Sequence, residues 1–87
     1  MARRRLSEAN RAHGQRLGAY LREARLRTKR SAQEIAEASD LSIDTVRSIE
    51  TGRTAAPSFL TVTRIADALG IRLDDIRAAI ELKGGEN

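Results

Sequence analysis

Residues 41–52 have the sequence LSIDTVRSIETG, which contains the signals for one short helix and for both of its ends. Ser42 is a common capping residue, because its hydroxyl oxygen accepts a hydrogen bond from a backbone N–H of the first helical turn. Val46 and Ile49 are spaced to lie on one face of a helix, where we expect them to be buried. Gly52 readily takes the left-handed conformation that ends many helices. We therefore expect a short helix that starts after the serine and stops at the glycine.

A second short helix is predicted immediately upstream, over residues 32–39. Ser31 and Glu34 form an S-x-x-E capping box, in which the serine hydroxyl and the glutamate carboxylate each accept a backbone N–H. Residues 40–42 remain for a tight turn between the two helices. Two short helices joined by a tight turn, with small polar residues at the start of the second, form the shape that enters the major groove of DNA.

Three further segments carry apolar residues at helical spacing, over about residues 10–28, 59–69 and 73–82. In the second of them, the residues expected to face the core are Phe59, Val62, Ile65, Ala66 and Leu69. The sequence has no alternating run of β-branched residues with hairpin turns. The predicted fold class is therefore all-α, a compact five-helix domain that contains a helix-turn-helix.

The predicted organisation is one domain over residues 10–82, with a basic, flexible arm over residues 1–9 and a flexible tail over residues 83–87. A length of 87 residues suits a single domain. The absence of cysteine excludes disulfides and thiolate metal sites. No apolar run approaches the roughly 20 residues that span a bilayer. We expect a cytoplasmic protein, associated with the nucleoid when it is bound to DNA, and no membrane contact.

The basic residues are concentrated near the start of the chain. Residues 1–30 contain ten Lys/Arg and two Glu, a charge of +8, whereas residues 31–87 contain six basic and ten acidic residues, a charge of −4; together they give the net +4. A basic segment of this kind favours a polyanionic partner. The chain has one Tyr, one Phe and no Trp, so a stacking platform for single-stranded nucleic acid is not expected.

Several pieces of the sequence, taken in their order and spacing over residues 17–76, resemble the phage-repressor/Cro-type (XRE) helix-turn-helix domain. The matching pieces are LREAR at 21–25, SAQEIA at 31–36, LSIDTVRSIETG at 41–52, PSF at 57–59 and IADALGI at 65–71. The resemblance implies a compact, repressor-like fold and a transcriptional regulator, acting as a repressor, that binds double-stranded DNA as a homodimer. It also implies that the helix over about residues 43–51 is the recognition helix in the major groove.

The resemblance further implies that the exposed, N-terminal side of the recognition helix faces base edges. The predicted base contacts are Ile43, Asp44, Thr45, Arg47 and Ser48. Arg47 has the chemistry for two hydrogen bonds to a guanine, and Ile43 for contact with a thymine methyl group. Two interpretations of Asp44 stay open: it accepts a hydrogen bond from cytosine, or it only stabilises the positive end of its own helix.

The predicted phosphate contacts are Arg25, Ser31, Ser42, Arg53 and Thr54. Ser31 and Ser42 cap helices whose free N–H groups form natural anion sites, although each serine is also explained by capping alone. Arg53 and Thr54 follow the predicted recognition helix, at a point where members of the family commonly contact the DNA backbone. The resemblance also implies an ion pair between Arg25 and Glu50 that braces the motif, the alternative being that both charges are simply solvated.

Arg3, Arg4 and Arg5 have two interpretations as well. They form an arm that enters a narrow, A·T-rich minor groove, or a disordered basic tail that adds nonspecific, salt-sensitive affinity. Nothing in the sequence directs the path of such an arm, which favours the second. Two positions depart from the family pattern: Ala32 stands where many members have Gln, and Arg30 where an apolar residue is usual.

The sequence contains no catalytic set, no cluster of metal ligands and no phosphate-binding glycine loop, so neither enzymatic activity nor a cofactor is expected. The rival hypothesis is a protein-interaction module, an antitoxin-like or adaptor protein that uses the same fold to bind a protein partner. Leu73, Ile76 and Ile80 in the last predicted helix are the candidate homodimer interface. The alternative is that the same three residues simply close the core, which the small size of the chain favours.

Overall fold

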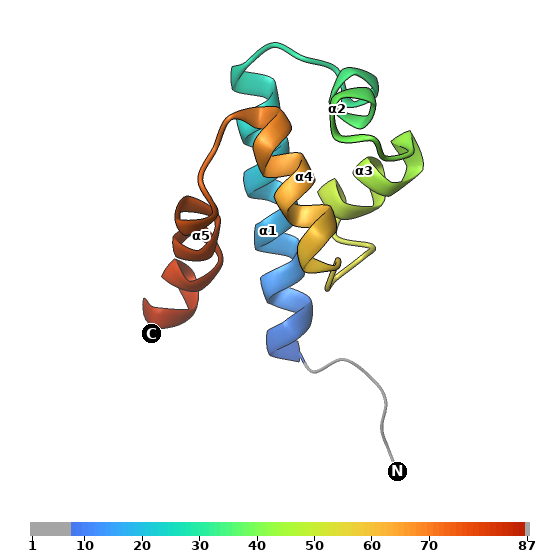
Figure 1. Cartoon of the computed structure of the whole chain (residues 1–87). Coiled ribbons are helices and arrows are strands. Elements are labelled where there is room, and N and C mark those ends of the chain that lie inside the picture. The colour runs from blue at the N-terminus through green and yellow to red at the C-terminus, as the bar shows by residue number, and fades with distance from the viewer. Residues whose placement is uncertain (1–7, 87) are drawn as a thin grey trace.

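The computed structural model describes residues 8–86, with side chains as far as residue 81, and in this range it contains five helices and no strand. The helices are α1 (Glu8–Arg27), α2 (Ala32–Ser39), α3 (Ile43–Glu50), α4 (Phe59–Leu69) and α5 (Leu73–Glu86), as Figure 1 shows. The all-α, five-helix prediction is confirmed. Within the described range, no helix combines the length and apolar character needed to cross a membrane.

The outer ends of α1 and α5 differ from the sequence-based bounds. The first helix begins at Glu8, two residues earlier than expected. The last helix continues to Glu86, so residues 83–86 extend α5 where the sequence predicted a separate tail. Gly84 and Gly85 are weak helix formers rather than breakers, at a cost of about 1 kcal/mol each relative to Ala. A glycine pair is therefore a poor predictor of a helix end.

The core is built around α1, which lies at the centre of Figure 1 with α2 and α3 on one side and α5 on the other. The first helix packs against α3, α4 and α5, while α2 packs against α3 and α4. The largest fully buried side chains are Leu21, Ile35, Val46 and Ile49, one from each of α1 and α2 and two from α3. Of the two short helices of the predicted motif, α3 is thus anchored directly to the long central helix, and α2 is held through its packing against α3 and α4.

Two glycines are required by the path of the backbone. A Cβ at Gly18 would overlap the carbonyl oxygen of Ile49 and lie 2.9 Å from that of Glu50, so the backbones of α1 and α3 touch at this point. Gly52 has a φ of +81°, in the left-handed region predicted for the residue that follows α3. Both glycines therefore determine where α3 lies and where it ends.

The prediction that Phe59, the first residue of α4, faces the core is wrong. Ile65, Ala66 and Leu69 are buried as predicted, but the side chain of Phe59 is 73% exposed. As the first residue of α4, it borders a groove of about 310 Å³ that separates this end of the helix from α5. Helical spacing predicts which face a residue occupies, but it does not predict where the neighbouring helix diverges.

Candidate nucleic-acid interface

The first helix of the motif, α2, begins with the capping box that the sequence predicts. The Glu34 N–H donates to Ser31 Oγ at 3.0 Å, and the Ser31 N–H donates to Glu34 Oε1 at 2.8 Å. With its first-turn N–H groups partly unpaired and its dipole positive at this end, the start of α2 favours an anion.

The tight turn between α2 and α3 is also formed by local interactions. Asp40 caps the end of α2 with a left-handed φ of 59°, and the Leu41 N–H donates to the carbonyl oxygen of Ala36 at 2.9 Å. Ser42 then caps α3 by accepting the Thr45 N–H at 3.1 Å. These contacts confirm the turn and both predicted caps.

An ion pair ties α1 to the last residue of α3. Arg25 Nε and Nη2 donate to the two carboxylate oxygens of Glu50 at 2.8 and 3.0 Å, and Nη1 donates to the carbonyl oxygen of Arg30 at 2.9 Å. The hydrogen bond to Glu50 is the main cause of a raised pKa of the Arg25 guanidinium; burial acts against it and the charge of Glu50 adds to it. The brace predicted from the family resemblance is therefore present.

The predicted base-contacting residues differ in how much of each side chain is free. Asp44 and Arg47 are exposed, whereas Thr45 and Ser48 are half-buried. Ile43 is half-buried and packs against the apolar core, so only part of it is available to a ligand. The exposed ridge of α3 is thus formed mainly by two of its three charged residues, Asp44 and Arg47.

On the side of α1 and α2, α3 borders a hollow of about 380 Å³, which we call the basic hollow. Its lining includes Arg22, Arg25, Ser31, Ala32, Arg47 and Glu50. Glu50 is already paired with Arg25, so the exposed charges of Arg22 and Arg47 leave the lining positive. Arg22 was not among the residues predicted from the sequence, although its spacing of three residues from Arg25 places both on one face of α1.

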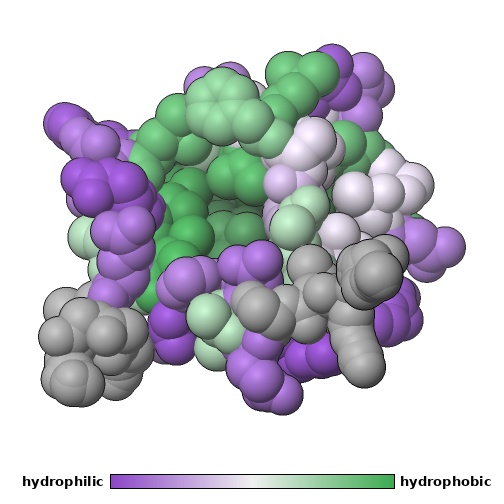
Figure 2. Space-filling model, turned by 90° about the horizontal axis from the view of Figure 1, so that it is seen from below, coloured by the Kyte–Doolittle hydropathy of each residue, from purple (hydrophilic) through white to green (hydrophobic). Residues whose placement is uncertain are grey.

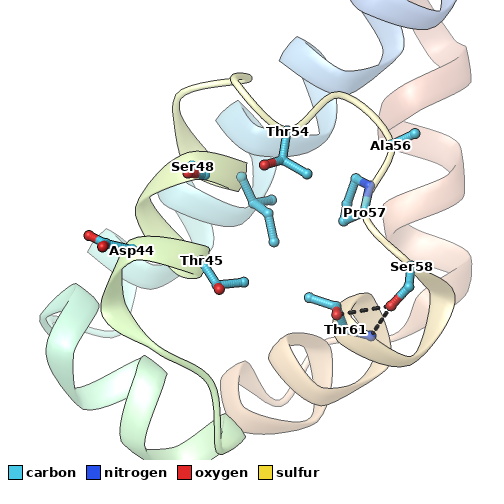
Figure 3. A pocket seen from close by; sticks show the side chains of 9 residues that line it. Asp44, Thr45, Ser48, Thr54, Ala56, Pro57, Ser58 and Thr61 are labelled. Carbon is cyan, nitrogen blue, oxygen red and sulfur yellow. Dashed lines mark hydrogen bonds between the residues drawn. The ribbon is translucent and has the colours of Figure 1, made fainter.

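On the opposite side, α3 borders a second hollow, of about 440 Å³, which we call the hydroxyl hollow. It is lined by Thr45 and Ser48 of α3, Thr54 of the following loop, and Ser58 and Thr61 at the start of α4. In Figure 3 these side chains surround the opening, and Asp44 lies at its rim. The contribution of Ser58 and Thr61 was not predicted from the sequence, because it depends on how the start of α4 lies relative to α3.

The loop after α3 folds back onto that helix. The Thr54 N–H donates to the carbonyl oxygen of Ser48 at 3.1 Å, and Arg53 Nη2 donates to Ser48 Oγ. The structure therefore brings Arg53 and Thr54 next to the predicted base-contacting residues. The predicted arm residues Arg3, Arg4 and Arg5 lie outside the described residues.

Comparison of the sequence with known protein families identifies the family of this chain. Residues 16–79 match the model of a family described as a helix-turn-helix domain, which is more than half of the chain. The chain belongs to the helix-turn-helix family. The resemblance to such a family stated from the sequence is therefore confirmed.

Among solved structures, this helix-turn-helix protein is similar to the clp gene regulator ClgR from C. glutamicum. The two chains are 28% identical, with a TM-score of 0.74, and the match covers 86% of this chain and 96% of that one. No curated protein matches the sequence.

Both departures from the family pattern now have a structural explanation in this helix-turn-helix protein. Arg30 replaces apolar packing with a hydrogen bond from its Nη1 to the carbonyl oxygen of Ala68 in α4, at 2.7 Å. Ala32 is buried at the edge of the basic hollow, where it leaves room but offers no side-chain donor. Any polar side-chain contact at this edge of the hollow therefore has to come from residues next to Ala32.

The candidate dimer residues divide between the core and the surface of the helix-turn-helix protein. Ile76 is 4% exposed and belongs to the core, Ile80 is half-buried, and Leu73 is 41% exposed. Leu73 and Ile80 line the groove beside Phe59, which we call the apolar groove. Figure 2 shows this face of the molecule, where apolar side chains surround a hollow and polar side chains lie around it.

Proposed function

We propose that this helix-turn-helix protein binds double-stranded DNA in a sequence-specific manner and regulates transcription as a repressor, with α3 in the major groove. The family and the similarity to a clp gene regulator support a role in transcription. The main structural support for the proposal is the arrangement of exposed polar groups on and around α3. Its exposed ridge bears Asp44 and Arg47, and a polar hollow lies on each side of the helix.

Two hollows beside one exposed helix match the shape of duplex DNA. The major groove of B-DNA is about 12 Å wide and admits one α-helix, so the phosphates of both strands lie beside an inserted helix. On one side of α3, the exposed charge of Arg22 and the start of α2 behind Ser31 favour an anion, beside Arg25, whose charge is paired with Glu50. The basic hollow is therefore assigned to the phosphates of one strand.

The hydroxyl hollow is assigned to the phosphates of the other strand. Thr54 and Thr61 line this hollow with hydroxyl groups that can donate to phosphate oxygens, while Ser58 donates its own hydroxyl to Thr61 Oγ1 at 2.9 Å. Ser42 caps the end of α3 that enters the groove, where the helix dipole favours negative charge. Contacts of this type position the protein on DNA but carry no information about sequence.

Base recognition is assigned to the ridge of α3. Arg47 is exposed and presents a planar guanidinium, the group best suited to the O6 and N7 atoms of guanine. Asp44 is exposed too, so contact with a cytosine amino group and stabilisation of the helix N-terminus are compatible roles. Thr45 contributes from the edge of the ridge, and Ile43 only through the part of its side chain that is free.

The active form is a homodimer that buries the apolar groove. Phe59 is 73% exposed and Leu60 59% exposed, an unusual surface position for two large apolar side chains that follow each other. Asp74, Arg77 and Glu81 line the groove as well, so its rim carries both signs of charge and can complement a second copy of itself. Two copies would bind half-sites about one helical turn apart on duplex DNA, within the cytoplasm.

The direct test is the salt dependence of duplex binding. Each phosphate contact releases counterions, so the slope of log K against log salt concentration is about −0.9 per contact. We expect a steep slope for the native chain, and a slope shallower by about 1 for Arg22→Ala. Fluorescence anisotropy with a labelled duplex measures both.

Arg72→Ala is the matched control, since Arg72 is exposed in the α4–α5 connection and lines neither hollow. It removes the same charge and should leave the slope unchanged. Binding of duplex DNA that is absent or insensitive to salt would favour the rival hypothesis of a protein-interaction module.

A further inference from the structure

We propose that Arg53 contacts a base edge in the major groove and that Ser48 is the residue that positions it. This inference rests on the proposed function, and it replaces the sequence-based expectation of a phosphate contact for Arg53. Its basis is the hydrogen bond from Arg53 Nη2 to Ser48 Oγ, between the loop after α3 and a residue on the surface of α3 itself.

The backbone on both sides of Arg53 is held in place. Gly52 turns the chain at the end of α3 with a φ of +81°, and its N–H donates to the carbonyl oxygen of Ile49 at 3.1 Å. On the other side, the Thr54 N–H donates to the carbonyl oxygen of Ser48, also at 3.1 Å. The side chain of Arg53 therefore starts at a defined point beside the last turn of α3 and returns along that helix.

Because the side chain of Arg53 returns along α3, it is better placed to contact a base than a phosphate. Phosphates lie at the edges of the major groove, whereas base edges lie at its floor, against an inserted helix. Ser48 lies one helical turn after Asp44, which is exposed on the ridge of α3, so a guanidinium bonded to Ser48 lies beside the ridge that is assigned to the bases. Among the side chains that the structure describes, no carboxylate lies within 4.0 Å of Arg53, so its charge is not neutralised by an ion pair.

The expected ligand is the major-groove edge of a guanine. The guanidinium has five N–H donors, and the contact with Ser48 uses one of them. The remaining donors include a pair with the geometry for O6 and N7 of guanine. Ser48 lines the hydroxyl hollow while Arg47 lines the basic hollow, so the two arginines are placed to contact different base pairs.

The experiment compares base preferences in the whole chain. A preferred duplex is recovered from a random library by the native protein, and each base pair of it is then replaced in turn. At one G·C pair, replacement should weaken native binding by about 5- to 150-fold. For Arg53→Ala the loss at that pair should fall to about twofold or less, with preferences at other positions kept.

Ser48→Ala tests the positioning role, and Arg72→Ala is the control for loss of one positive charge. Ser48→Ala should weaken the preference at the same G·C pair, and the double variant should behave like Arg53→Ala alone. Arg72→Ala should retain every preference.

A uniform loss of affinity in Arg53→Ala, with all base preferences kept, would mean a phosphate contact and overturn the inference. A Ser48→Ala effect at a different base pair would overturn the positioning role. If the native chain selects no sequence at all, the proposed function itself fails. That result differs from the two above, in which the native chain selects a sequence and only the role of Arg53 or of Ser48 is wrong.

Discussion

The Arg25–Glu50 pair holds two ionised groups that are nearly withdrawn from water, with side chains 12% and 8% exposed. Such a pair adds little net stability compared with two apolar residues, because both ions lose their hydration. Removal of one partner is costly, since the other charge then stays buried and unpaired. The pair connects α1 to the end of α3, so its loss should change how α3 is held against α1.

Arg25→Met should lower the free energy of unfolding by about 3–5 kcal/mol, because Glu50 is left without its partner. Adding Glu50→Leu should restore most of the loss. Glu81→Gln is the control, since the exposed pair of Arg77 and Glu81 contributes about 0.5 kcal/mol or less. Urea denaturation followed by circular dichroism measures all three; equal losses for Arg25→Met and Glu81→Gln would contradict the bracing role.

At the scale of single residues, the sequence was most informative where a role is local. The caps at Ser31 and Ser42 could be predicted because the donor lies three residues away in the chain. The environment of Arg22 could not, since it depends on how α1 passes the start of α2. The contact between Arg53 and Ser48 also escaped prediction, because it depends on the path of a loop without a regular pattern.

At the scale of the elements, α1 and α3 approach each other closely at Gly18. An alanine in a helix interior is ordinarily better than glycine by about 1 kcal/mol. Here the added methyl group would meet the carbonyl oxygens of Ile49 and Glu50, which belong to a helix and cannot easily move. The separation of the two helices is therefore set by the absence of a side chain.

Gly18→Ala should destabilise the fold by about 1–3 kcal/mol, as overpacking of a core does, despite the gain in helix propensity. Thermal unfolding measures the change. Ala19 is next to Gly18 and exposed, so Ala19→Gly measures the effect of helix propensity alone. It should lower the free energy of unfolding by about 1 kcal/mol. A more stable Gly18→Ala variant would show that α1 and α3 are not in contact there.

The helices themselves could mostly be predicted, and their outer limits could not. Each of α2, α3 and α4 begins directly after a serine cap and ends near a glycine or a left-handed residue, so local chemistry marks both ends. The end of α5 lacks such a marker. Its continuation through Gly84 and Gly85 was therefore missed.

Considered as a whole, the molecule presents polar hollows around α3 and an apolar groove between α4 and α5. The sequence predicted base contacts for this part of α3 through its likeness to a family, and the structure shows that Asp44 and Arg47 are exposed there, while the contacts themselves stay a prediction. The hollows beside this helix could not be predicted, because each combines residues from elements far apart in the chain. The exposure of Phe59 was missed for the same reason.

Phe59→Asp should weaken self-association by about 30-fold or more, as loss of a central aromatic contact does. The monomer should stay folded, because the side chain is 73% exposed. Leu26→Asp is the matched control, since Leu26 is 49% exposed on α1 and does not line the groove. Sedimentation equilibrium gives the dissociation constants; a native chain that stays monomeric alone and on DNA would contradict the dimer.

The central claim is that α3 recognises DNA sequence, and selection of bound duplexes from a random library tests it most directly. The native chain and Arg47→Ala are carried through the selection in parallel, and circular dichroism shows that both are folded. We predict that the native chain enriches a two-fold-symmetric site, and that Arg47→Ala keeps this site but loses the preference for guanine at one position of each half. No enrichment by the folded native chain, or identical preferences in both proteins, would contradict the claim.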